Sequence, residues 1–157
     1  MLAHFIGDLH QPLHVAAVYL DSNGGLVDPD ASGQANPATE TEVGNRLHDQ
    51  HRIFHAEWDA ISADLGEAAT PELLALARSR PPNPGNVEDW PAAWASDTII
   101  VSHDAFVGTK FRQTSADHWS VTFDNREAYL ASEDTIKRQQ LAKAEARLAE
   151  LLNAIWP

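Results

Sequence analysis

The chain has 157 residues, of which 43% are hydrophobic and 22% are charged, and this length suits one ordinary globular domain. Its formal net charge of −12 argues against a groove that binds phosphates through lysine and arginine alone, although bound metal ions could supply positive charge. Because the chain has no cysteine, disulfides and thiolate zinc sites are excluded, and any metal must be held by histidine and carboxylate side chains.

The first part of the chain predicts a short helix, a proline break and a long loop. Apolar residues recur at the spacing of one helix face, at Leu2, Phe5, Ile6 and Leu9. Pro12 disfavours helical backbone for the residue before it, so the helix should end there. Residues from about 20 to 44 are rich in Gly, Asp, Asn, Pro and Ser, which predicts a long surface loop.

The rest of the chain predicts further helices. Helical spacing of apolar residues covers 46–65, 71–79, 88–106 and about 126–155. Thr70 is expected to cap the second of these helices, with Pro71 at its first position. Residues 107–124 read as irregular, with no convincing strand alternation. We therefore expect an all-α fold with a single domain over residues 1–157.

Two His-x-x-x-Asp pairs are candidate metal ligands. His4 with Asp8, and His55 with Asp59, each lie four residues apart, so on a helix both side chains point the same way. One such pair is more often a local hydrogen bond, but two pairs beside apolar stripes, together with His14, favour an N- and O-ligated cation such as zinc.

Other histidines leave alternatives open. His48 and His51 would share a helix with His55 and could form a metal face by spacing alone, but a solvated helix surface is the preferred interpretation. His10 lies between the candidate ligands, and a structural or solvent-facing role is favoured for it. Asn45 could orient a group near the metal site and bind substrate, or it could be a simple turn residue.

The exact residues of three segments are more specific evidence of a protein family than the spacing of the candidate ligands. "HFIGDLHQPLHV" at 4–15, "GN" at 44–45 and "FHAEWD" at 54–59 closely resemble the zinc-dependent single-strand-specific nucleases of the S1/P1 type. That family belongs to an all-α superfamily shared with zinc phospholipase C. "AWASDT" at 93–98 and "QLAKAEARLAELLNAI" at 140–155 are similar to later family motifs, so the resemblance covers nearly the whole chain.

The chain also departs from the family pattern. Val43 stands where the first glycine of a "GGN" motif is usual, and Gly24 with Gly25 is a rival match for that glycine pair. Asp97, Thr98 and Glu145 replace the usual Glu, Ser and Gly. An aspartate at position 59 favours the nucleases, because the phospholipase branch is expected to carry glutamate there.

The resemblance implies a set of zinc ligands. Family members hold three zinc ions, and the matching residues here are His4, Asp8, His14, His55 and Asp59. His14, His55 and Asp59 would form one complete site, while His4 and Asp8 would supply half of a second and Asp8 would also touch the third. The remaining family ligands precede the first motif, so we expect this chain to be the C-terminal part of a nuclease, weakly active or inactive alone.

The resemblance also implies an activity. Intact members hydrolyse phosphodiester bonds of single-stranded DNA and RNA to 5′-phosphate products, with a 3′-nucleotidase side activity, and bound zinc lowers the pKa of its water to about 7 for this chemistry. We expect nucleic acid and nucleotides as substrates, no membrane span and no protein partner. Family members are periplasmic or secreted, although this chain starts without a signal peptide. The alternatives are a zinc phospholipase C-like hydrolase and a non-catalytic zinc-binding remnant.

Overall fold

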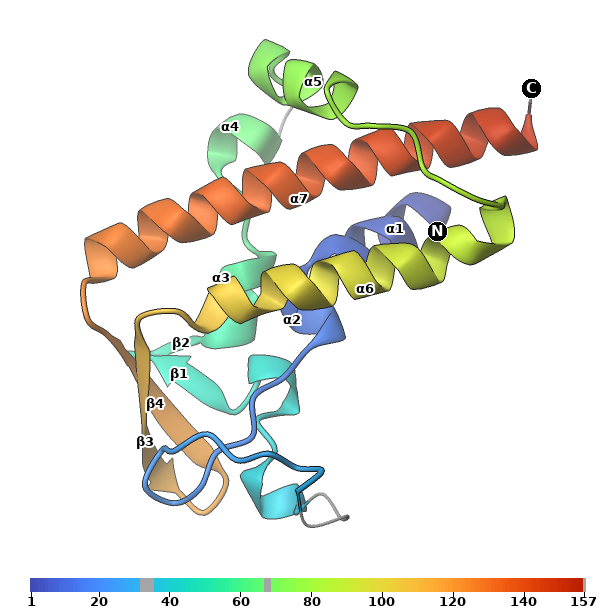
Figure 1. Ribbon diagram of the computed structural model, residues 1–157. Helices are drawn as coiled ribbons and strands as arrows, with labels where there is room; N and C mark the ends of the chain where they lie inside the picture. Colours follow the sequence, from blue (N-terminus) through green and yellow to red (C-terminus); the bar gives the residue numbers. More distant parts are fainter. Residues whose placement is uncertain (32–35, 67–68, 157) are drawn as a thin grey trace.

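The structure is a computed structural model that describes residues 1–31, 36–66 and 69–156 (Figure 1). The α-helices are α1 (Leu2–His10), α2 (Pro12–Val15), α3 (Phe54–Asp59), α4 (Ala63–Gly66), α5 (Pro71–Arg78), α6 (Trp90–Ser102) and α7 (Arg126–Ile155). Short 3₁₀ turns are η1 (Pro37–Thr39), η2 (Glu42–Gly44), η3 (Val87–Asp89) and η4 (His103–Phe106). The two long helices α6 and α7 run alongside each other, and α1 packs against both (Figure 1).

A four-stranded sheet makes the fold mixed, so the all-α prediction is wrong. The strands are β1 (Leu47–Asp49), β2 (Arg52–Ile53), β3 (Thr109–Ser115) and β4 (His118–Phe123), in the order β2-β1-β4-β3. β1 pairs in parallel with β4, and the other two pairings are antiparallel. In β4, Trp119 and Val121 are buried while their neighbours are not, which is the two-residue period of a half-buried strand. The stretch 107–124 is therefore a hairpin, and its short alternation was not recognised in the sequence.

The predicted single helix over 46–65 is also wrong, because its first half is a hairpin and its second half is divided into α3 and α4. Residues 47–53 form the β1–β2 hairpin, whose turn includes Gln50 at a positive φ of 55°. The helix begins only at Phe54. Leu47 and Phe54 both reach the core, one from a strand and one from a helix, so their spacing did not distinguish the two structures. His48 and His51 consequently do not share a helix with His55.

Other helix predictions are confirmed. α5 begins at Pro71, and the Thr70 hydroxyl accepts a hydrogen bond from the Leu73 N–H as an N-cap. α7 begins after Asn125, whose side chain caps the helix by accepting from the Ala128 N–H. α6 and η4 together span most of the predicted 88–106 segment. No helix among the described residues has the length and apolar character needed to cross a membrane.

The loop predicted at about 20–44 lacks long elements in its described part. It contains η1 and η2, and residues 32–35 lie outside the described residues. Gly24 packs against β3, where an added Cβ would lie 2.0 Å from the Phe111 carbonyl oxygen, so no other residue fits this position. The loop is therefore fastened to the sheet at Gly24.

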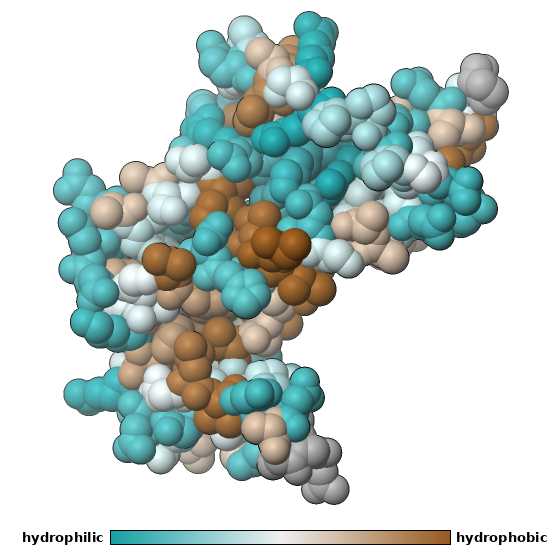
Figure 2. All heavy atoms as spheres, viewed as in Figure 1, coloured by the Kyte–Doolittle hydropathy of each residue, from teal (hydrophilic) through white to brown (hydrophobic). Residues whose placement is uncertain are grey.

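The main core lies between the sheet and the helices packed against it, among them α3 and α7. Two residues of α3, Phe54 and Trp58, are buried in a cluster with Leu47, Trp119 and Tyr129. Burial of such side chains contributes about 1.5–3 kcal/mol each. These two anchors fix the rotation of α3 and turn His55 and Asp59 away from the core. Apolar side chains also reach the surface across the middle of one face (Figure 2).

Candidate metal centre

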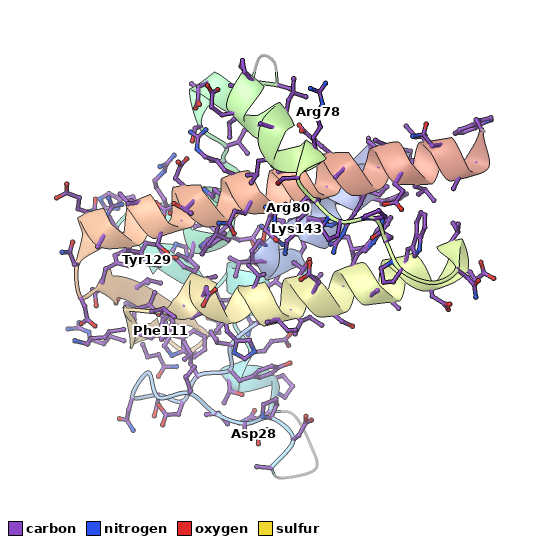
Figure 3. The ribbon with its side chains drawn as sticks, turned by 45° about the horizontal axis from the view of Figure 1, so that its top comes forward. Asp28, Arg78, Arg80, Phe111, Tyr129 and Lys143 are labelled. Carbon is purple, nitrogen blue, oxygen red and sulfur yellow. The ribbon has the colours of Figure 1, made fainter. Side chains whose placement is uncertain are left out.

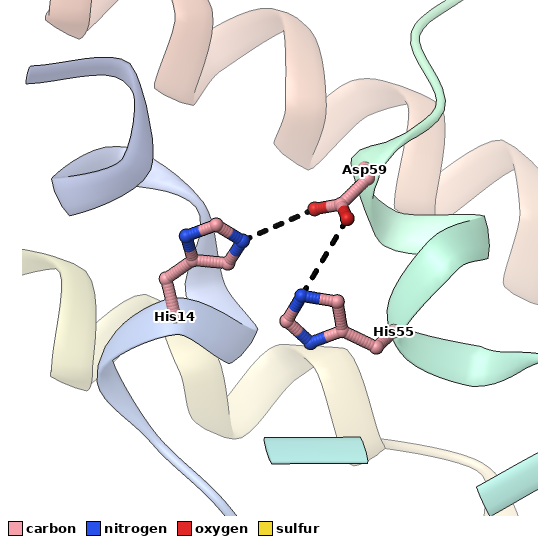
Figure 4. A group of neighbouring side chains, drawn as sticks. All are labelled: His14, His55 and Asp59. Carbon is pink, nitrogen blue, oxygen red and sulfur yellow. Dashed lines mark hydrogen bonds and ion pairs between the residues drawn. The ribbon is translucent and has the colours of Figure 1, made fainter. Parts of the chain in front are cut away.

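Two short helices bring His14, His55 and Asp59 together (Figure 4). His14 lies on α2, beyond the Pro12 break, and the other two lie one turn apart on α3. The His14 Nε2 atom is 3.2 Å from Asp59 Oδ1, and the His55 Nε2 atom is 3.5 Å from Asp59 Oδ2. The two imidazole rings stack with their centroids 4.9 Å apart. One potential ligand atom from each residue lies within 4.8 Å of the other two.

This group has the chemistry and spacing of a zinc site. Two imidazoles and one carboxylate are the ligand set of many catalytic zinc sites, which keep a fourth position open. Ligand atoms about 2.0–2.2 Å from a tetrahedral ion lie about 3.3–3.6 Å apart, close to the separations from Asp59 to each histidine. The His55 side chain is 15% exposed and that of Asp59 is 48% exposed, so the group opens to solvent on one side. The residues present therefore fit the ion.

The backbone before β1 holds His55 in one tautomer. The Val43 carbonyl lies 2.8 Å from His55 Nδ1, and because a carbonyl only accepts, Nδ1 must carry the proton. The Nε2 lone pair is then free to bind a metal, as in metal-ligating histidines generally. Val43 adopts φ 52° and ψ 30°, a left-handed conformation that disfavours a β-branched residue.

The structure resolves which glycine belongs beside this site. Gly44 has φ +90°, and a Cβ there would lie 3.2 Å from Leu13 Cδ1 and 3.6 Å from the His55 backbone nitrogen. Gly24, the rival match, packs against β3 instead. The 43–45 segment is thus the one adjoining the candidate ligands.

Gln11 is a participant that the sequence analysis missed. Its Nε2 donates to Asp59 Oδ1 at 2.8 Å, and its Oε1 accepts from the Leu13 N–H at the start of α2. One side chain therefore links the helix that carries His14 to the carboxylate that faces it. The signal was present, since Gln11 directly precedes Pro12 and occupies the N-cap of α2.

The first His–Asp pair lies next to this group. His4 Nε2 is 3.3 Å from Asp8 Oδ2, and His14 Nδ1 is 3.8 Å from Asp8 Oδ1. His14 thus stands between two carboxylates and connects the His4 pair with the His55 pair. All five candidate ligands form one continuous chain of contacts.

The remaining candidates lie elsewhere. The His48 ring faces the His118 ring at 5.3 Å between centroids, across the sheet, and His51 is in the β1–β2 turn. The Asn45 side-chain amide donates to the Glu42 carbonyl at 3.0 Å and closes the η2 turn. Its role in substrate binding stays a prediction.

His10 is a buried structural residue and not a member of the metal group. It is 2% exposed, and burial lowers its pKa to about 4, so the ring is neutral at neutral pH. Arg147 can only donate, so His10 Nε2 accepts from it at 2.8 Å, and Nδ1 donates to the Ile6 carbonyl at 2.7 Å. His10 thereby ties α1 to α7.

A cavity of about 210 Å³ opens beside the group, between α1, α3 and α7. Trp58, Ile61 and Leu141 supply apolar wall, while Asp8 and Asp59 lie along its polar side. A substrate group held here would be within reach of the candidate ligands. The cavity is large enough for a small planar or branched group rather than a whole polymer chain.

One family model, described as S1/P1 nuclease, matches residues 1–157 and so covers the whole chain, including every residue of the candidate centre. No curated protein and no solved structure matched this chain.

Proposed function

Because the chain belongs to the S1/P1 nuclease family, we propose that it is a zinc-dependent hydrolase of phosphodiester bonds in single-stranded DNA and RNA. The products would carry 5′-phosphates, and the enzyme would have an additional 3′-nucleotidase activity. The observation that carries the proposal is the convergence of His14 from α2 with His55 and Asp59 from α3. The family match favours this nuclease activity over the phospholipase C-like alternative. We also propose export to the periplasm or the medium, which fractionation would test.

In this proposal the three side chains hold one zinc ion, and His4 with Asp8 supplies ligands toward a second. Bound zinc supplies Lewis-acid stabilisation of a phosphoryl oxygen and lowers the pKa of water. The Val43 carbonyl keeps the Nδ1 proton of His55 in place, and Gln11 orients Asp59. Local cationic charge at the centre would also explain how a chain with a net charge of −12 attracts a phosphate.

The test begins with zinc per folded chain, measured by elemental analysis after exhaustive dialysis. We expect about one tightly held ion from the single three-residue group in the described part of the chain. His55→Ala should remove that ion and any hydrolysis of single-stranded DNA, whereas His51→Ala, in the β1–β2 turn, should keep both. A folded wild-type chain without zinc would refute the metal assignment. Zinc binding without hydrolysis would leave a non-catalytic zinc-binding module.

A further inference from the structure

A second cavity lies between α6 and α7, beneath the proline-rich segment 80–84, which passes over α7 in Figure 3. Its volume is about 280 Å³, and none of the candidate metal ligands lines it. Asn83 fixes the segment over the helices, since its backbone N–H and side-chain amide donate to Glu150 and its Oδ1 accepts from the Trp94 indole at 2.7 Å. The prolines on both sides restrict the backbone further. The wall of this cavity is therefore preorganised.

Three cationic side chains line the cavity, namely Arg80, Lys143 and Arg147. Lys143 Nζ and Arg147 NH2 share the Asp97 carboxylate, at 2.9 and 3.0 Å. Burial alone would raise the pKa of Asp97, but the hydrogen bonds from these two cations hold it below its usual value, so the carboxylate is ionised. Each of the two cations has further N–H groups to donate.

Of these three cations, Arg80 is the one that has no ion-pair partner among the described residues. Within the described ranges, its guanidinium makes no hydrogen bond or ion pair, and its Nε is buried without a partner. The nearby Glu150 accepts three hydrogen bonds from Asn83. A buried N–H donor without an acceptor costs about 1–3 kcal/mol, and more for a charged group, so the position favours an anion. Figure 3 shows Arg80 close to Lys143 over the middle of α7.

We propose that this cavity binds a phosphate group, with Arg80 as the main donor and Lys143 and Arg147 at its side. A planar guanidinium donates two parallel N–H bonds to phosphate oxygens, and the neighbouring ammonium adds a point charge. The cavity is lined by three cations and two carboxylates, so the net charge of its lining is positive although the chain as a whole is acidic. The site is separate from the metal centre, and its occupancy requires neither zinc nor hydrolysis.

The test compares Arg80→Gln with Arg78→Gln, which removes the same charge from an exposed position on α5 that does not line the cavity. The full chain is dialysed against a chelator, checked for folding by circular dichroism, and titrated with inorganic phosphate at constant ionic strength. The thermal unfolding midpoint reports binding, since a ligand of the folded state raises it. We expect Arg80→Gln to weaken phosphate binding by about tenfold or more, and Arg78→Gln to leave it unchanged.

A second variant and a second ligand sharpen the result. Arg80→Lys keeps the charge but loses the paired N–H donors, and it should bind phosphate with intermediate affinity. If Arg80→Gln also weakens binding of a short oligothymidylate, the site holds a phosphate of a bound strand. If only inorganic phosphate is affected, it holds free phosphate. Equal phosphate binding by wild type and Arg80→Gln would overturn the proposal.

Discussion

Val43→Gly should stabilise the protein, although it removes a half-buried side chain. A left-handed conformation costs an L-residue about 1–2 kcal/mol, and a β-branched residue lies toward the upper end. Glycine avoids this cost but loses about 0.5–1 kcal/mol through the greater freedom of its unfolded chain. Set against a conformational cost of about 2 kcal/mol, this loss leaves about 1–1.5 kcal/mol. The lost burial of the half-buried valine side chain reduces the net gain in the free energy of unfolding to about 0.5–1 kcal/mol. The carbonyl that accepts the His55 proton belongs to the backbone and is retained.

A gain of about 1 kcal/mol corresponds to an increase of about 2–4 °C in the unfolding midpoint of a chain of this size. Urea unfolding and calorimetry of the metal-free chain would measure it. The matched control is Val107→Gly, at φ −66° and 66% exposed, where no left-handed strain is relieved. This control should lose about 0.5–1 kcal/mol. If both variants were destabilised equally, the strain at Val43 would not exist and the reasoning would fail.

The remaining predictions concern residues around the core and the metal centre. Gln11→Ala should weaken zinc binding about 10–100-fold, because Asp59 loses the donor that orients it. Competition with a chromophoric chelator would measure the zinc affinity, and an affinity equal to that of the wild type would contradict this role of Gln11. Tyr129→Phe should cost about 1–3 kcal/mol in urea unfolding, because the phenol accepts from the Trp58 indole and donates to a buried carbonyl; a neutral result would contradict this network. His10 has a folded pKa of about 4 against 6.5 unfolded, so the unfolded state binds the proton first as pH falls. Metal-free stability should decline below about pH 6.5 by up to about 1.4 kcal/mol per pH unit and level off below about pH 4. His10→Gln should flatten that pH dependence, and an unchanged slope would assign it to other groups.

The helices were predictable where local signals agree. Thr70 and Pro71 mark the start of α5 with a cap and a preset φ, and the apolar spacing along α7 continues for many turns. The pairing of β1 with β4 was not predictable in this way, because these strands meet through Leu47 and Trp119, which lie far apart in the chain. β1 and β2 are also very short, so alternation within either one carries little information.

The candidate ligands were predictable because helical spacing and motif wording both act locally. The supporting contacts were not, since the residues that orient Asp59 and His55 do so from other segments. Val43 acts through a carbonyl oxygen, which every residue possesses, so its side chain carried no hint of the role. Its departure from the family glycine became meaningful only when its positive φ was known.

The parallel pairing of β1 with β4 has a kinetic consequence. Bringing distant segments together costs chain entropy before their contacts contribute favourable energy. This step should therefore be slow compared with helix formation. The Trp119 N–H donates to the Arg46 carbonyl, and η2 and α3 lie directly on either side of the hairpin that this bond anchors. We therefore expect the His14–His55–Asp59 group to become complete only when the two distant strands have met. In refolding experiments a zinc-dependent signal should develop with the slowest phase, which would make the metal a reporter of the finished sheet.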